Sequence, residues 1–185
     1  MATHCEGSLH LHGGLAEHNT MNVAEIKARC PEVVEDSRMY VPFANIGLPL
    51  QPRFRTVRTI DRSGDEIIAW VAAYEDGTNQ GMLFGPAVID GSFQASCAFQ
   101  NLEALPSLRI PLSIDRLTIY GQGYSQKVWV HHTLLENSDK QLESNVVLAK
   151  DDEVIIMTMD RMRLREVRPE HIAKMLAASA GDADE

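Results

Sequence analysis

An aspartate and a glutamine four residues apart, Asp90 and Gln94, are the side chains whose types and spacing could do chemistry. The apolar residues around them predict a helix over 86–102. It begins at Pro86, which suits a first helical position because its missing N–H costs nothing there. Residues four apart lie on one face of a helix, and a carboxylate in the first turn is stabilised by free N–H groups and by the helix dipole. If a cleft opens at that end, Asp90 is the group for acid–base chemistry, and a simple capping aspartate is the alternative.

The rest of the chain predicts the sheet that must hold this helix. One long apolar helix among antiparallel strands is an α+β pattern in which the sheet can wrap the helix. Turns rich in Gly, Asn and Asp separate the extended segments. We expect strands over 53–61, 66–74, 108–120, 126–136, 142–150 and 153–166, with a further short strand at 9–12. Shorter helices are expected over 23–30 (capped by Asn22) and 169–178, and a short helix or a pair of turns over 37–47.

Four segments resemble, in order, motifs of polyketide synthase dehydratase domains. Residues 85–94 (GPAVIDGSFQ) are similar to the family's D-x-x-x-Q or D-x-x-x-H motif, and residues 47–54 (GLPLQPRF) to its G-x-x-Y-G-P-x-F motif. Residues 108–120 (LRIPLSIDRLTIY) and 155–165 (IIMTMDRMRLR) resemble two of its strands. The resemblance covers residues 3–172 and implies a hotdog fold, an antiparallel sheet wrapped round one long central helix.

The family's dehydratase is a double hotdog, and the resemblance places this chain in its second half. The family's catalytic histidine lies in an H-x-x-x-G-x-x-x-x-P motif of the first half. His10 comes closest to that motif because Gly14 follows it, but Asn19 stands where proline is needed. We therefore expect a leader over 1–21 that resembles the end of the first hotdog plus a linker, a hotdog domain over 22–172, and a helix end with an acidic tail over 173–185.

The activity that the resemblance implies is elimination of water from a β-hydroxyacyl thioester on the phosphopantetheine of an acyl carrier protein. No cofactor of the protein's own is expected. A histidine from outside this chain would take the α-proton, while Asp90 would protonate or orient the leaving hydroxyl and Gln94 would hold the carboxyl. Burial raises the pKa of such a carboxyl and the helix dipole lowers it, and the sequence leaves that balance open.

Substrate is expected to contact residues on the helix and on the segment before it. Gly91 would let substrate approach the backbone because it has no side chain. Leu50 and Gln51 replace the family's Tyr and Gly, so the loss of the tyrosine argues against an unaltered reaction, and Gln51 is a candidate polar substitute. The predicted substrate-binding residues are Gly91, Pro86, Gln51, Pro52 and Phe54.

The composition limits which partners and which cellular compartment we expect. The chain has 185 residues, 44% of them hydrophobic, which suffices for one core, and its net charge of −9 argues against nucleic-acid binding. Neither a signal peptide nor a membrane-length apolar run is present, so we expect a cytoplasmic protein that binds no membrane. The three cysteines lack the spacing of a metal site. His10 and His12 share a predicted strand face and with His4 or Cys5 could bind zinc or nickel, but two histidines without a fixed third ligand are seldom a metal site, and none is expected. Because this chain is acidic overall, binding of an acidic carrier protein would require a local basic patch on its surface. The candidates for it are Arg53, Arg55, Arg58, Arg161, Arg163, Arg165 and Arg168.

Three functions remain open at this point. The chain could be the aspartate-bearing half of a dehydratase, completed by neighbouring synthase domains or an N-terminal hotdog half. It could instead be a hotdog relative with double-bond isomerase or thioester-handling activity, or a non-catalytic scaffold of a synthase. An unpaired sheet edge predicts that the isolated chain forms a homodimer, and the missing base predicts that it is inactive.

Overall fold

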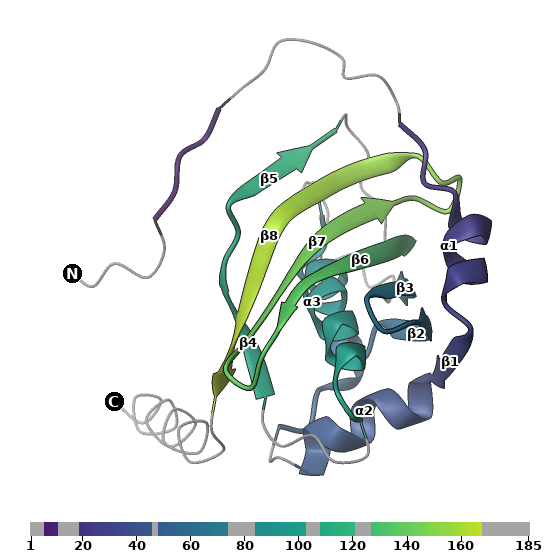
Figure 1. The fold of residues 1–185 in the computed structure, drawn as a ribbon, viewed down its shortest axis with the longest axis vertical. Helices are drawn as coiled ribbons and strands as arrows, with labels where there is room; N and C mark the ends of the chain where they lie inside the picture. The colour runs from purple at the N-terminus through teal and green to yellow at the C-terminus, as the bar shows by residue number, and fades with distance from the viewer. Residues whose placement is uncertain are drawn as a thin grey trace.

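A curved antiparallel sheet surrounds one helix, α3 (Pro86–Ala95), in the computed structural model of the protein (Figure 1). The structure describes residues 6–10, 19–45, 48–73, 84–102, 108–120 and 127–167. Across these ranges eight strands form one sheet in the order β1-β2-β3-β6-β7-β8-β4, and β5 also pairs with β8. The α+β class and the sheet wrapped round a helix, both predicted from the sequence, are confirmed.

The strands and remaining helices have the following bounds. The strands are β1 (Glu32–Glu35), β2 (Val57–Arg62), β3 (Glu66–Ala72), β4 (Leu108–Ser113), β5 (Arg116–Ile119), β6 (Lys127–Asn137), β7 (Gln141–Ala149) and β8 (Ile155–Val167). The remaining α-helices are α1 (Val23–Arg29) and α2 (Asp36–Asn45), and two short 3₁₀ helices are η1 (Pro52–Phe54) and η2 (Ser96–Phe99).

Alternation along the long strands sends one set of side chains toward α3. On β6, Val128, Val130 and His132 are buried, and His132 contacts α3. The pairing of β6 with β7 shifts register between Leu134 and Glu136, and such irregularities bend a strand and increase its twist. The core therefore lies between α3 and the concave face of the sheet, and is mostly aliphatic and methionine-rich.

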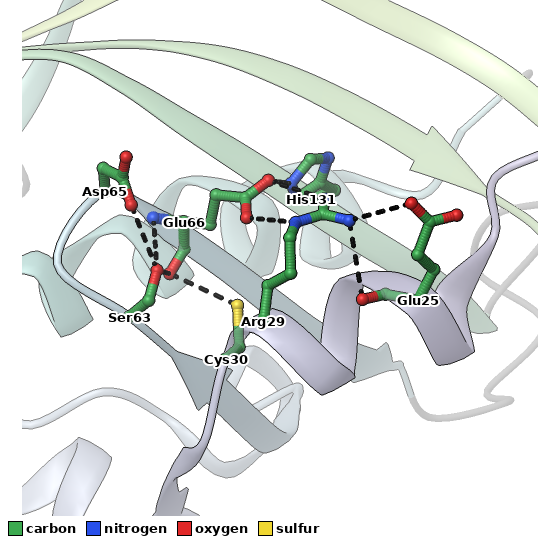
Figure 2. A network of polar contacts seen from close by, with 7 residues as sticks. All are labelled: Glu25, Arg29, Cys30, Ser63, Asp65, Glu66 and His131. Carbon is green, nitrogen blue, oxygen red and sulfur yellow. Dashed lines mark hydrogen bonds and ion pairs between the residues drawn. The ribbon is translucent and has the colours of Figure 1, made fainter.

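Helix α1 lies outside the curl, against the outer face of the sheet (Figure 1). Asn22 caps it as predicted, since its side chain accepts a hydrogen bond from the Glu25 N–H at 3.0 Å. Figure 2 shows how Arg29 fastens the other end of α1: its Nε and Nη2 each lie 2.8 Å from a different oxygen of Glu66 on β3. His131 on β6 contacts the same carboxylate at 3.1 Å.

Several local predictions differ from the structure. The α-helix predicted over 86–102 ends at Ala95 and continues as η2, because Ser96 donates its N–H to the carbonyls of Phe93 and Gln94. The strand predicted over 53–61 begins only at Val57, since Pro52 starts a 3₁₀ turn.

Two further differences lie in the first part of the chain. Strand β1 was not predicted, although it pairs with β2 through all four of its residues. Residues 9–10 form neither helix nor strand. The rest of the strand expected at 9–12 and the helix expected over 169–178 fall outside the described residues.

Candidate active site

Asp90 and Gln94 form a hydrogen-bonded pair on α3. The Gln94 Nε2 donates to Asp90 Oδ2 at 2.6 Å, so the amide fixes the orientation of the carboxyl. Gln94 is buried, whereas Asp90 is partly exposed. The Asp90 carboxyl therefore lies at the edge of the core, where it accepts a hydrogen bond from the buried Gln94 amide.

Asp90 lies deeper in the helix than the sequence indicated. It is the fifth residue of α3, and the first turn holds no acidic residue, so the predicted first-turn placement is wrong. The helix dipole acts mainly on the first turn and falls off beyond it. Burial raises the pKa of Asp90 above its ordinary value, and the hydrogen bond from Gln94 opposes that shift. Burial thus decides the balance that the sequence left open, and it favours the protonated carboxyl.

Gln94 is itself held by the segment that precedes β2. Its Nε2 also donates to the backbone carbonyl of Phe54 at 2.9 Å. Its Oε1 is buried and has no hydrogen-bond partner among the described residues. A buried acceptor of this kind favours a ligand with an O–H or N–H to donate.

The predicted substrate-binding residues lie at different depths. Phe54 belongs to η1 and is partly buried, while Gln51 and Pro52 just before it are exposed. Pro86 is exposed at the start of α3. The structure thus joins Phe54 to the Asp90–Gln94 pair through a backbone carbonyl, and shows no such hydrogen bond from Gln51.

The absence of a side chain at Gly91 allows close packing of α3 against its neighbours. A Cβ at Gly91 would lie 2.1 Å from Thr56 Oγ1 and 2.8 Å from Val71 Cγ1. These neighbours fill the space on the Cβ side of Gly91, so its predicted contact with substrate would have to come from another direction and remains a prediction. The glycine instead lets α3 come close to β3 and to the residue before β2.

None of the described histidines forms a hydrogen bond with Asp90 or Gln94. His10 is exposed in a segment without regular structure, and His131 faces α1 on the outer side of the sheet. His132 points inward, but its ring nitrogens contact Ser92 O at 2.9 Å and Ser144 Oγ at 3.2 Å. Burial lowers the pKa of His132 to about 4. Period-2 alternation over the strand predicted at 126–136 places His131 and His132 on opposite faces, and the burial pattern of β6 confirms this.

Four of the seven basic residues predicted to attract an acidic partner form two groups. Of the other three, Arg58 is partly buried, Arg165 is exposed on β8, and Arg168 lies outside the described residues. Arg161 and Arg163 both contact the buried carboxylate of Glu143, at 2.8 and 2.9 Å, and both also pair with Asp115. Their charges are therefore compensated locally. Arg53 and Arg55 are exposed near η1, where their guanidinium groups lie over the rings of Phe54 and Tyr40.

No group of three or more potential metal ligands occurs in the part of the chain that the structure describes. None of the helices in that part is long and apolar enough to cross a membrane.

A sheet wrapped round a helix that carries an aspartate–amide pair defines a hotdog protein with a candidate acid–base site. The family model described as "Polyketide synthase dehydratase N-terminal domain" matches residues 18–173. The chain belongs to the polyketide synthase dehydratase family.

Solved structures agree on the fold. A dehydratase domain of a trans-AT polyketide synthase from Brevibacillus brevis matches with a TM-score of 0.74 and 20% identity, covering 83% of this chain and 55% of that one. The dehydratase domain of a mycocerosic acid synthase-like polyketide synthase matches with a TM-score of 0.73 and 18% identity, over 83% of this chain and 56% of that one. An inactive mutant of the CurJ dehydratase gives 0.72 and 18%, over 84% and 55%. The chain thus spans about half the length of each of these domains.

Among curated proteins, the spectinabilin polyketide synthase system protein NorA' of Streptomyces orinoci is 31% identical over 86 residues. The match covers 46% of this chain and 2% of that protein. The matched family description names an N-terminal domain, so the placement of this chain in the second hotdog remains a prediction.

Proposed function

We propose that this chain is the aspartate-bearing part of a dehydratase that removes water from a β-hydroxyacyl thioester on an acyl carrier protein. The observation that carries the proposal is the Asp90 carboxyl, whose pKa is raised by burial and which Gln94 holds at 2.6 Å. A raised pKa favours the protonated form of this carboxyl, which can give its proton to a departing hydroxyl. Membership of the dehydratase family supports this assignment.

Each residue of the pair has its own role. Asp90 donates a proton to the β-hydroxyl as the C–O bond breaks, so the oxygen leaves as water. The α-proton is taken by a histidine that lies outside this chain. Gln94 orients the Asp90 carboxyl through Nε2, while its unpartnered Oε1 accepts a hydrogen bond from the hydroxyl or from the departing water. The protein needs no cofactor for these steps.

The expected partners follow from this chemistry. The substrate arrives on the phosphopantetheine of an acyl carrier protein, and an N-terminal hotdog half or another synthase domain supplies the base. Arg53 and Arg55 are the exposed cations on the segment that contacts Gln94, and they are the best-placed candidates for attracting an acidic carrier. The cytoplasm remains the expected compartment.

The test compares two proteins in the same assay. A protein extended upstream to include an H-x-x-x-G-x-x-x-x-P segment is incubated with a β-hydroxyacyl carrier protein, and the acyl chain is weighed by mass spectrometry. We expect the acyl chain to lose the mass of one water with the extended protein and to keep its mass with Met1–Glu185 alone. Dehydration by the isolated chain would show that it contains a base of its own, and no dehydration by either protein would refute the proposal.

A further inference from the structure

A buried histidine on the sheet contacts the backbone of α3 between Asp90 and Gln94. His132 is fully buried, and its Nε2 lies 2.9 Å from the carbonyl oxygen of Ser92. Its Nδ1 lies 3.2 Å from the hydroxyl of Ser144 on the neighbouring strand β7. His132 takes no part in the proposed proton transfer, so its burial needs another explanation.

The Ser92 carbonyl needs a partner because the helix changes type just beyond it. In a continuing α-helix that carbonyl would accept the N–H of Ser96. Here the Ser96 N–H is directed to the carbonyls of Phe93 and Gln94, where η2 begins. Ser92 is fully buried, so water cannot take the place of the lost helical bond. His132 supplies the missing donor.

The contacts of His132 define its tautomer. A carbonyl oxygen only accepts, so the proton must sit on Nε2. Nδ1 is then free of hydrogen and accepts the hydroxyl proton of Ser144. Burial, which lowers the pKa of His132 to about 4, keeps the ring neutral and leaves this arrangement intact near neutral pH.

We propose that His132, held in its Nε2-protonated tautomer by Ser144, is a positioning residue that fixes the junction of α3 and η2 and thereby the aim of Gln94 at Asp90. Gln94 lies two residues beyond the carbonyl that His132 holds, and one residue before the end of α3. If this junction were not held, the end of α3 could shift relative to Phe54, whose carbonyl the Gln94 side chain must reach. The effect of this Gln94 orientation on catalysis rests on the proposed function, and the positioning role of His132 does not.

Three variants separate hydrogen bonding from simple space filling. His132→Leu fills the core but donates no hydrogen bond. His132→Gln keeps a terminal N–H₂ that can reach the Ser92 carbonyl. Ser144→Ala leaves the ring in place and removes only the hydroxyl that defines its tautomer.

The experiment is NMR on the full chain Met1–Glu185, labelled with ¹⁵N-histidine and with ¹³C in the aspartate carboxyls. We expect the wild-type His132 shifts to show a protonated Nε2, and Ser144→Ala to shift the ring toward a mixture of tautomers. In His132→Leu the pKa of Asp90 should rise further, because the hydrogen bond from Gln94 no longer lowers it. His132→Gln should restore the wild-type titration of Asp90.

Opposite results overturn the proposal. They are a wild-type proton on Nδ1, or an Asp90 titration in His132→Leu that equals the wild-type one. If His132→Leu fails to fold, the decision passes to Ser144→Ala, whose tautomer must change if the assignment is correct. Because no readout depends on dehydration, failure here is distinguishable from failure of the proposed function.

Discussion

Asp90 and Gln94 take their properties from different neighbours, although one helix carries both. Burial raises the pKa of Asp90, while the Phe54 carbonyl and the Asp90 carboxyl both accept hydrogen bonds from the Gln94 amide. The spacing of four in the sequence predicted that the two would share a face. It could not predict the Phe54 contact, because that depends on a 3₁₀ turn forty residues upstream.

The close approach at Gly91 predicts a measurable cost for a single methyl group. Gly91→Ala should lower the free energy of unfolding by about 1–3 kcal/mol, because its Cβ would overlap Thr56 Oγ1 at 2.1 Å. The better helix propensity of alanine, worth about 0.5–1 kcal/mol, offsets only part of this. Denaturant unfolding measures the difference.

A matched control is Gly64→Ala in the turn between β2 and β3. A Cβ there meets no atom within 4 Å, so the change should stay within about 0.5 kcal/mol. If both variants unfolded at the same denaturant concentration, the packing role of Gly91 would be wrong.

The neutral state of His132 predicts a pH dependence of stability. Folding lowers the pKa of this ring from its ordinary 6.5 to about 4, so between these values the unfolded chain binds more protons. The contribution of His132 is therefore complete above pH 6.5 and is lost as the pH falls toward 4, by about 1–3 kcal/mol. The contribution of His132 is measured by comparing the free energies of unfolding of the wild type and His132→Gln at pH 7 and at pH 4.5. An equal pH response of both proteins would contradict the assignment.

At the scale of elements, the sequence located the helix and the long strands but not the junctions between them. Pro86 indicates the start of α3 correctly, and alternation indicates β6, β7 and β8 to within two residues at each end. The end of α3 escaped prediction because the apolar pattern continues through Cys97 and Phe99 while the backbone tightens to 3₁₀ geometry. Side-chain oxygens of Ser92 and Ser96 donate back to carbonyls three residues earlier, which no hydrophobic pattern reveals.

The arginine clamp of Figure 2 predicts that α1 can be loosened without unfolding the sheet. Arg29→Ala removes both 2.8 Å bonds to Glu66, so amide hydrogen exchange should accelerate in α1 and stay unchanged in β6–β8. The control is Glu25→Gln, which removes the charge from two exposed contacts within the helix region, with Arg29 at 3.4 Å and with Asn22 Nδ2 at 3.2 Å, and leaves the Arg29–Glu66 bonds in place. Faster exchange throughout the sheet in Arg29→Ala would show that α1 is part of the global unfolding unit.

At the scale of the whole molecule, apolar side chains gather at one edge of the sheet. Ile110 and Leu112 on β4 are 40% and 54% exposed, and Leu117 and Ile119 on β5 are 46% and 41% exposed. Both strands pair with β8, and neither pairs with another strand among those described. Open apolar edges of this kind attract another chain.

The isolated chain is therefore expected to dimerise through β4 and β5. Leu117→Lys should shift the light-scattering mass from dimer toward monomer, because a charge on this edge opposes pairing. Val33→Lys provides the control, since Val33 is 60% exposed on β1 at the opposite end of the sheet. A monomeric wild-type chain, or equal effects of both variants, would refute this use of the edge.

The central claim is that Asp90 transfers a proton, and Asp90→Asn in the upstream-extended protein tests it most directly. The rate of water loss from a β-hydroxyacyl carrier protein is measured beside the melting temperature, with Gln94→Ala as a graded comparison. We predict that Asp90→Asn abolishes dehydration with the melting temperature unchanged, whereas Gln94→Ala lowers the rate by about ten- to a hundredfold because it only orients the carboxyl. A variant Asp90→Asn that kept more than about a tenth of the wild-type rate would contradict the account.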